Sequence, residues 1–502
     1  MNSLNRDSGI DVLIVGAGPT GLTLAIDLAR RGVPCRVVDR SPTPFTGSRG
    51  KGLQPRTQEV FEDLGVLDRI RAAGGPYPPM RAYRGAEIVW EGRLEEPREP
   101  APGEPYPNAW MVPQFRTTEI LRDRLAELGG SVETGTELVG LGQDDAGVTA
   151  TVARAGRTGS IRAGYLVGAD GGGSTVRRAA GMAFLGETVE TQRMLVADVR
   201  ATGVDRAHWH VWPEPDDPGR AVALCPLAGT DLFQFTAMVA PDSTPETTAP
   251  AVREILDAAT GRAGIRLVDV GWTSLWRSNI RMVDRYRVGR VFLAGDAAHV
   301  HPPTGGQGLN TGVQDAYNLG WKLALVLAGA PDGLLDSYQA ERLPVAADVL
   351  GISATLYDAA VRGAADAHRR DDPRLKQLGV TYRDGPLAAE HRPAAPGPRA
   401  GDRAPDAPCR DADGHPVRLF DLFRGPHVSL LTFTGDDRLS VRAGGRRVDL
   451  VDTGGHARDA YGVPAGVTYV LVRPDGHVGV ASHDRADVDR YLDRLGATLP
   501  TP

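Results

Sequence analysis

The sequence predicts an α/β protein in which one domain of parallel strands and helices is interrupted by a second, strand-rich domain. Three short apolar runs, beginning near residues 11, 165 and 291, each lead into a glycine-rich turn and then a helical pattern. The segments between them, 76–107 and 186–274, favour strands, several of alternating character. After about residue 365 the composition changes, and the proline- and glycine-rich stretch 391–402 indicates a linker to a separate C-terminal domain.

The overall composition limits the classes of function. With 502 residues, the chain suits three structural units at roughly 150 residues each. The formal charge of −6 argues against a nucleic-acid partner, which selects a basic face. The widely spaced Cys35, Cys225 and Cys409 predict neither a disulfide framework nor a metal site. Because the sequence shows no signal-peptide pattern and no membrane-length apolar run, we expect a cytoplasmic protein without a membrane partner.

The first glycine motif predicts a dinucleotide site. Asp11–Val15 has the pattern of a buried strand, and Gly16-Ala-Gly18-Pro-Thr-Gly21 follows it directly. In this strand–turn–helix context, Gly16 permits a tight turn, Gly18 lets the backbone approach a pyrophosphate, and Gly21 lets the helix pack on the strand. The free N–H groups at the start of the helix then face the phosphates.

An acid at the end of the next strand completes this Rossmann-like pattern. The strand at 36–38 ends at Asp39, whose carboxylate is placed to accept hydrogen bonds from the adenosine ribose. The motif alone fits FAD or NAD equally. It disfavours NADP, because the 2′-phosphate would meet a carboxylate.

A second strand-to-loop transition lies in the middle of the chain. The strand pattern from Tyr165 runs into Asp170 and three glycines, and the helix that follows has Ser174 as a possible N-cap. On its own this motif is equally well explained as a turn capped by the aspartate.

The third loop favours FAD over NAD. Its strand ends at Gly295-Asp296, and Gly305, Gly306 and Gly308 come directly before a long helical pattern. Backbone N–H groups at the positive end of that helix suit a delocalised anion. The N1–C2 edge of a reduced flavin is such an anion.

Taken together, the motifs G-x-G-x-x-G, D-G, G-D-A-A-H and P-P-x-G-G-Q-G-x-N resemble the class A FAD-dependent aromatic monooxygenases, the superfamily of para-hydroxybenzoate hydroxylase. Within it, the chain looks most similar to the aromatic polyketide hydroxylases and phenol hydroxylases, over about residues 8–365. The resemblance implies a discontinuous FAD-binding domain (1–75, 108–185 and 275–365), a substrate-binding β-sheet domain (76–107 and 186–274), a helix and linker (366–396) and a thioredoxin-like C-terminal domain (397–502).

The resemblance also implies which residues hold FAD. Asp39 binds the ribose with Arg40 near the adenosine, and Asp296 holds the ribityl chain and pyrophosphate. Asp170 touches the pyrophosphate side, Gln114 contacts the flavin, and Pro302 lies against the ring. The full predicted set is Gly16, Gly18, Pro19, Thr20, Gly21, Asp39, Arg40, Arg49, Lys51, Gln114, Asp170, Gly295, Asp296, Pro302, Gly305, Gly306, Gly308, Leu309 and Asn310.

One loop departs from the family pattern. The stretch 48–56 corresponds to S-R-x-x-G-L-H-x-R in relatives, but Lys51 stands where an arginine is common and Gln54 where a histidine is common. A lysine ammonium is a point charge and cannot form the planar fork of a guanidinium. We keep both Arg49 and Lys51 as predicted cofactor contacts.

The resemblance implies a monooxygenase whose oxygen chemistry belongs to the cofactor. NADPH or NADH reduces FAD during a transient visit, O2 adds to the flavin, and the C4a-hydroperoxide hydroxylates a phenolic, polycyclic aromatic substrate. This chemistry requires no catalytic side chain and no metal, and His299 is expected to pack beside the flavin loop. We expect a monomer or a homodimer.

The remaining segments predict a sheet and a small C-terminal domain. Strands are predicted at 196–199, 207–212, 221–226 and 233–240, and then at 428–434, 468–472 and 478–482. A closing helix is predicted at 485–495, capped by Asp484, and the absence of C-x-x-C predicts no disulfide chemistry. The aromatic side chains that suit either a substrate wall or a core are Tyr77, Trp90, Trp110, Trp209, Trp212, Phe233 and Phe235.

Other functions stay open on the sequence alone. Baeyer–Villiger oxygenation of a polycyclic ketone uses the same scaffold, and a reductase would also fit it. A flavin-loaded protein could instead sequester an aromatic compound without turnover. A flavin-dependent halogenase is disfavoured, because residues 271–276 do not match G-W-x-W-x-I-P.

Overall fold

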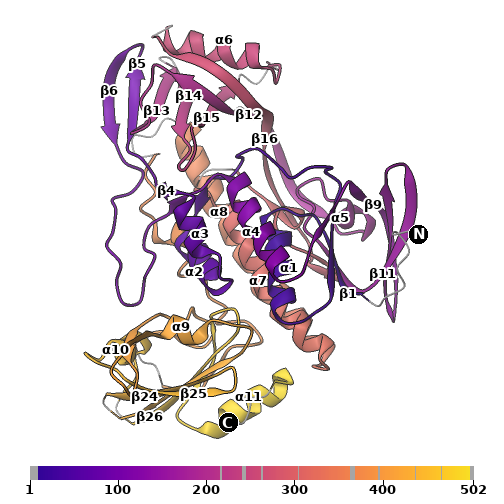
Figure 1. The fold of residues 1–502 in the computed structure, drawn as a ribbon, viewed down its shortest axis with the longest axis vertical. Coiled ribbons are helices and arrows are strands. Elements are labelled where there is room, and N and C mark those ends of the chain that lie inside the picture. Colours follow the sequence, from indigo (N-terminus) through magenta and orange to yellow (C-terminus); the bar gives the residue numbers. More distant parts are fainter. Residues whose placement is uncertain are drawn as a thin grey trace.

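The computed structural model describes residues 10–214, 217–239, 243, 245–261, 264–302, 305–361, 368–393, 396–435, 437–464 and 466–497. Figure 1 shows a sheet with α1 and α7 beside it, a second sheet above, and a third sheet below near the C-terminus. Ala240, the predicted end of one strand, and parts of the predicted linker lie outside the described residues.

The first sheet carries the predicted nucleotide-binding strands. Its parallel centre forms because apolar residues of β1, such as Val12 and Ile14, are fully buried between flanking elements. The strand order is β17 (Arg287–Val288), β18 (Val291–Leu293), β11 (Arg157–Gly168), β1 (Ile10–Val15), β2 (Cys35–Asp39) and β8 (Val132–Thr134), with β10 (Gly147–Arg154) and β9 (Thr136–Asp144) extending from β11.

Helices on this sheet bring the glycine loops together. Helix α1 packs against both α7 and α4, so the first and third motifs lie side by side. The helices of this part are α1 (Pro19–Arg30), α2 (Pro55–Asp63), α3 (Leu67–Ala72), α4 (Gln114–Glu127), α5 (Thr175–Ala179), α7 (Gly308–Leu327) and α8 (Asp336–Val361). The short strands β3 (Gly52–Leu53), β4 (Gly75–Pro76) and β7 (Trp110–Met111) form a small sheet beside them.

The second sheet is mostly antiparallel, and α6 (Ala249–Thr260) covers one of its faces. Its strand order is β19 (His299–Val300), β16 (Arg266–Val283), β12 (Phe184–Thr202), β15 (Phe233–Val239), β14 (Asp217–Pro226), β13 (Trp209–Glu214), β5 (Met80–Arg84) and β6 (Glu87–Gly92). The predicted domain boundaries at 185 and 275 fall inside β12 and β16. These two long strands pair along both halves of the molecule and join them.

The third sheet lies at the C-terminal end. Its strands are β20 (Ala389–Glu390), β27 (Val478–Ser482), β26 (Val467–Val472), β23 (Ser429–Thr434), β24 (Arg438–Ala443), β25 (Arg446–Val451), β21 (Pro408–Arg410) and β22 (Pro416–Arg418), with α9 (Leu419–Phe423), α10 (His456–Tyr461) and α11 (Arg485–Leu495) around them. The predicted helix and its cap are confirmed, because the Asp484 side chain accepts a hydrogen bond from the Ala486 amide.

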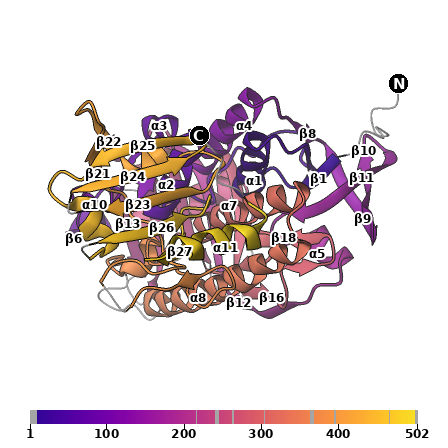
Figure 2. The ribbon, with the colours of Figure 1, turned by 90° about the horizontal axis from the view of Figure 1, so that it is seen from below.

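The C-terminal sheet docks against α7. Figure 2 shows α11 lying close to α7, and one apolar cluster unites Trp321 of α7 with Val488 and Leu492 of α11. The β24–β25 hairpin was not predicted, since its strands are short and charged. Within the described residues, no helix is both long and apolar enough to cross a membrane.

Candidate cofactor and substrate sites

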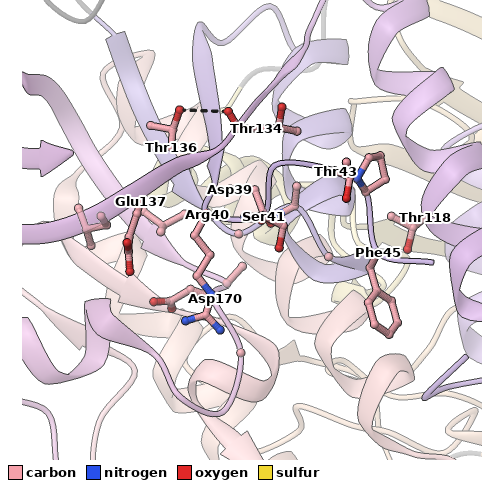
Figure 3. Close-up of a pocket in the computed structure, with 18 of the residues that line it drawn as sticks. Asp39, Arg40, Ser41, Thr43, Phe45, Thr118, Thr134, Thr136, Glu137 and Asp170 are labelled. Atoms are coloured by element: carbon pink, nitrogen blue, oxygen red, sulfur yellow. Dashed lines mark hydrogen bonds between the residues drawn. The ribbon is translucent and has the colours of Figure 1, made fainter. Parts of the chain in front are cut away.

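A groove of about 230 Å³ opens at the carboxyl ends of β1, β2 and β11 (Figure 3). Parallel sheets bind ligands at this edge, because the loops that leave the strands converge there. The structure brings six of the predicted cofactor residues to the wall of this groove: Gly16, Gly18, Asp39, Arg40, Gln114 and Asp170.

The glycine loop has the geometry that the motif predicts. Gly16 has φ +107°, and a Cβ there would lie 2.2 Å from the Ala169 carbonyl oxygen. A Cβ on Gly21 would lie 2.0 Å from the Gly16 carbonyl oxygen. Gly18, by contrast, has no neighbouring atom within 4 Å of its Cβ position, and no side chain caps the helix that begins after it. The start of α1 therefore offers open space and free N–H groups, which fits a pyrophosphate.

Asp39 supports the loop and lines the groove at the same time. Its carboxylate accepts hydrogen bonds from the Ala17 amide at 2.7 Å and from the Ser41 amide at 2.8 Å. A carboxylate has about four lone-pair sites, so capacity for ribose hydroxyls is left.

Asp170 acts locally as a helix cap. It accepts hydrogen bonds from the Ser174 hydroxyl at 2.5 Å and from the Thr175 amide at 2.7 Å. Ser174 in turn accepts from the Arg177 amide, which confirms it as the N-cap of α5. Asp170 therefore combines a capping role with a place on the groove wall.

The third loop wraps around the start of α7. Gly305 and Gly306 have φ values of +87° and +63°, a backbone conformation that residues with a Cβ rarely adopt. The side chain of Asn310 is fully buried and donates hydrogen bonds to the Gly52 and Gly306 carbonyl oxygens. The Asn310 amide therefore joins two loops, and its contact with the flavin stays a prediction.

Two further amides hold the loop 49–54 in place. Gln54 donates to the Gly305 carbonyl oxygen at 3.1 Å, and Gln114 accepts from the Gly50 amide at 3.0 Å. Gln54 was not among the predicted site residues, and its departure from the histidine that is common in relatives is the feature of the sequence that marks it.

The remaining predicted residues lie around these loops. Thr20 packs closely against Gly295, because a Cβ on Gly295 would lie 2.6 Å from the Thr20 hydroxyl oxygen. Pro19 begins α1, Leu309 lies near Gly50, and Pro302 is buried. Gly308 is the first residue of α7.

Asp296 lies three residues after the end of β18, at the surface beside the start of α7. Desolvation by the neighbouring protein atoms raises the pKa of Asp296, and the nearby His299 and Arg49 oppose the shift. His299 itself is fully buried and bonds the Asp315 carboxylate at 2.8 Å. It therefore packs behind the loop, and it is not among the described residues that line the groove.

A second cavity, of about 380 Å³, lies between the loop 305–306 and the second sheet. Arg49 and Lys51 line it, together with Tyr77 and Trp209. Trp212, Phe233 and Phe235 point to the other face of the sheet, into the core beneath α6. Side chains alternate between faces along a strand, so the register separates wall from core.

Two buried charge clusters, centred on Arg342 and on the adjacent Glu341 of α8, lie between the loop after β18 and the C-terminal sheet. Asp315 accepts from the Gly295 amide at 3.0 Å and from Arg342 at 2.7 Å. The neighbouring Glu341 pairs with Lys322 at 2.7 Å and with Arg473, between β26 and β27, at 2.6 Å. The charged side chains of both clusters are inaccessible to solvent.

Asp198 is a buried acid on the wall side of the second sheet, paired in register with Gln234. Within the part of the chain that the structure describes, neither of its carboxylate oxygens accepts a hydrogen bond, although Ser48 and Lys51 lie near. Burial raises the pKa of Asp198 to about 6, and Ser48 and Lys51 oppose the shift.

The variant Asp198→Asn is expected to be more stable than the wild type at pH 7 to 8. Folding raises the pKa of Asp198 from near 4 to about 6. Its ionisation therefore costs no stability at a pH below the unfolded pKa, and the cost is largest at a pH above the folded pKa. The difference in unfolding free energy should grow by about 2–3 kcal/mol across this interval. Thermal unfolding of both proteins from pH 4 to 8 measures it. The exposed Asp231→Asn serves as the control, and a pH-independent difference would contradict the assignment.

The class of protein follows from three features at one edge of a parallel sheet, and it is a flavoprotein. They are the first glycine loop, the acid at the end of β2 and the third loop at the start of α7. Residues 9–353 match the family model "FAD binding domain", and residues 397–501 match "Aromatic-ring hydroxylase, C-terminal". The chain belongs to this family of FAD-dependent aromatic-ring hydroxylases, and it is a flavin-dependent monooxygenase.

Individual relatives cover nearly the whole chain. A flavin-dependent monooxygenase of Mycobacteroides abscessus is 48% identical over 96% of this chain and 99% of its own length. A rifampicin monooxygenase of Streptomyces venezuelae is 35% identical over 95% of this chain and 97% of its own. The solved ternary complex of aklavinone-11 hydroxylase with FAD and aklavinone matches with a TM-score of 0.81 and 29% identity, over 98% of this chain and 99% of that one.

Proposed function

We propose that this enzyme hydroxylates a phenolic, polycyclic aromatic compound, using FAD, O2 and NADPH or NADH. The observation that carries the proposal is the second cavity, whose volume of about 380 Å³ suits a multi-ring ligand. Apolar side chains of the sheet, including Met194, Val196 and Met238, form one wall, and the loop 305–306 forms another. Relatives named for rifampicin and aklavinone support this choice.

The proposal assigns FAD to the strip that runs from the first groove to the second cavity. The start of α1 takes the pyrophosphate, and Asp39 accepts hydrogen bonds from the ribose. The glycines of loop 305–306 and the start of α7 take the isoalloxazine. When bound, FAD supplies the redox and oxygen chemistry.

The chain's own residues orient the substrate and exclude water from the reaction. Burial raises the pKa of Tyr77 above its ordinary value, so its hydroxyl keeps the proton and can donate a hydrogen bond into the cavity. Trp209 offers a flat apolar surface on the same wall.

The proposal includes the predicted domain division. Segments 1–75, 108–185 and 275–365 bind FAD, and 76–107 with 186–274 bind the substrate. Residues 397–502 form a thioredoxin-like domain without redox chemistry, after the linker 366–396. The nicotinamide nucleotide visits transiently, and the protein is a monomer or a homodimer.

Turnover under 18O2 tests the proposed function. NADPH is supplied with a panel of phenols, naphthoquinones, anthraquinones and tetracyclines, and the products are analysed by mass spectrometry and NMR. A new phenolic hydroxyl carrying one heavy oxygen is the expected result. A ring-expanded lactone would instead show Baeyer–Villiger chemistry. Tight binding of a compound without NADPH oxidation would favour sequestration. Either the lactone or binding without turnover would overturn the proposed hydroxylation.

A further inference from the structure

The wall of the second cavity carries an excess of positive charge. Among the described residues that line it, the charged ones are Arg49, Lys51, Arg93, Arg370, Lys376 and the acid Glu95. The buried Asp198 lies on the same face of the sheet, opposite Gln234. Lys376 lies 3.6 Å from the Glu95 carboxylate, so the acid is already matched by a cation of the same wall. The cavity therefore presents net positive charge to whatever fills it.

Lys51 is held in a defined position on this wall. Its ammonium donates a hydrogen bond to the Gln234 side-chain oxygen at 2.5 Å and lies 4.2 Å from the centre of the Trp209 ring. Gln234 is itself fixed, because its amide donates to the Ser48 carbonyl oxygen. The acceptor of its hydrogen bond is thus a neutral amide, and the titratable groups near it are the Cys225 thiol and the Asp198 carboxyl.

This arrangement favours an anion. When a ligand binds, it removes water from the nearby cation. This desolvation costs free energy, and a ligand with an opposite charge offsets that cost. Because the Lys51 ammonium covers a face of the Trp209 ring, an aromatic ligand that packs on the sheet beside Trp209 would bring its polar edge close to that ammonium.

We propose, on the basis of the proposed function, that the substrate is an anionic aromatic compound whose ionised oxygen, a carboxylate or an ionised phenol or enol, binds at Lys51. The aromatic body lies between Trp209 and the methionines of the sheet. Lys51, predicted from the sequence as a cofactor contact, acts as a specificity residue for the substrate.

Binding to the oxidised, FAD-loaded protein tests the proposal without any turnover. The probes are anthraquinone-2-carboxylate and its neutral carboxamide, with 2-hydroxyanthraquinone and 2-methoxyanthraquinone at pH 8.5 as the phenolate pair. Calorimetry and perturbation of the flavin spectrum give the affinities. The wild type should bind the anion of at least one pair about tenfold more tightly, as a hydrogen bond to a charged group requires. The preferred pair tells a carboxylate from a phenolate.

Variants of Lys51 separate charge from shape. Lys51→Met should lose about tenfold in affinity for the anion and less than twofold for its neutral partner, while Lys51→Arg should keep the preference. The exposed Arg154→Met on β10 is the control for a lost cation elsewhere. Equal affinities within both pairs, equal losses for both partners in Lys51→Met, or no binding of any probe would overturn the proposal. A failure of 18O incorporation alone would count only against the proposed function.

Discussion

Replacing Glu341 by glutamine is expected to destabilise the protein by about 3–5 kcal/mol, the usual cost of breaking a buried ion pair. Glu341 accepts hydrogen bonds from Lys322, Asn318 and Arg473, and its exposed fraction is 2%. Glutamine keeps the shape but leaves the Lys322 ammonium buried without its carboxylate. Since Arg473 belongs to the C-terminal sheet, the contact between that sheet and α7 weakens as well.

Chemical denaturation of the variant measures this loss. Lys322→Met removes the cation instead, and the double variant Lys322→Met/Glu341→Gln should lose less stability than the two single changes added together. A matched surface change is Glu127→Gln, whose carboxylate lies in an exposed pair with Arg69, so its loss should change the stability far less. Additive effects of the two buried changes would show that the pair is not coupled.

Gly16→Ala is expected to abolish FAD binding and to destabilise the protein without cofactor by at least about 3 kcal/mol. At φ +107° a side chain is strained, and its Cβ would lie 2.2 Å from the Ala169 carbonyl oxygen. The backbone of β1 or β11 must then shift, and the groove between them closes or widens. Flavin absorbance of the purified variant and thermal unfolding of its apo form measure the two effects.

Gly18→Ala is the matched control, because the same methyl group meets no protein atom within 4 Å there and φ is −75°. The apo form should unfold near the wild-type temperature. FAD should bind about tenfold more weakly or worse, because the methyl group occupies the approach of the pyrophosphate and costs a charged hydrogen bond. Unchanged FAD affinity in Gly18→Ala would contradict the assignment of the groove to the cofactor.

The sequence alone was sufficient where the signal is local. The strand at 11–15, the glycine turn after it and the acid Asp39 follow one another within one short segment, and the structure has each in place. The cap Ser174 and the C-terminal helix 485–495 were also predicted correctly. Such features depend on local backbone conformation and on neighbours a few residues away. Both can be predicted from the residue types at those positions.

Tertiary structure decided what depends on distant partners. The predicted contact of Asn310 with the flavin stays a prediction, but its amide donates hydrogen bonds to Gly306 in its own loop and to Gly52, more than 250 residues away in sequence. Trp209 and Trp212 differ by three positions and therefore lie on opposite faces, one at the cavity and one in the core. Glu341 links two parts of the molecule through its ion pair with Arg473, which the sequence does not indicate because the two residues are far apart in the chain. Residue type and spacing thus determined the class of protein and its cofactor loops, whereas register and long-range packing decided which side chains face the cavities, because these depend on contacts that no local pattern records.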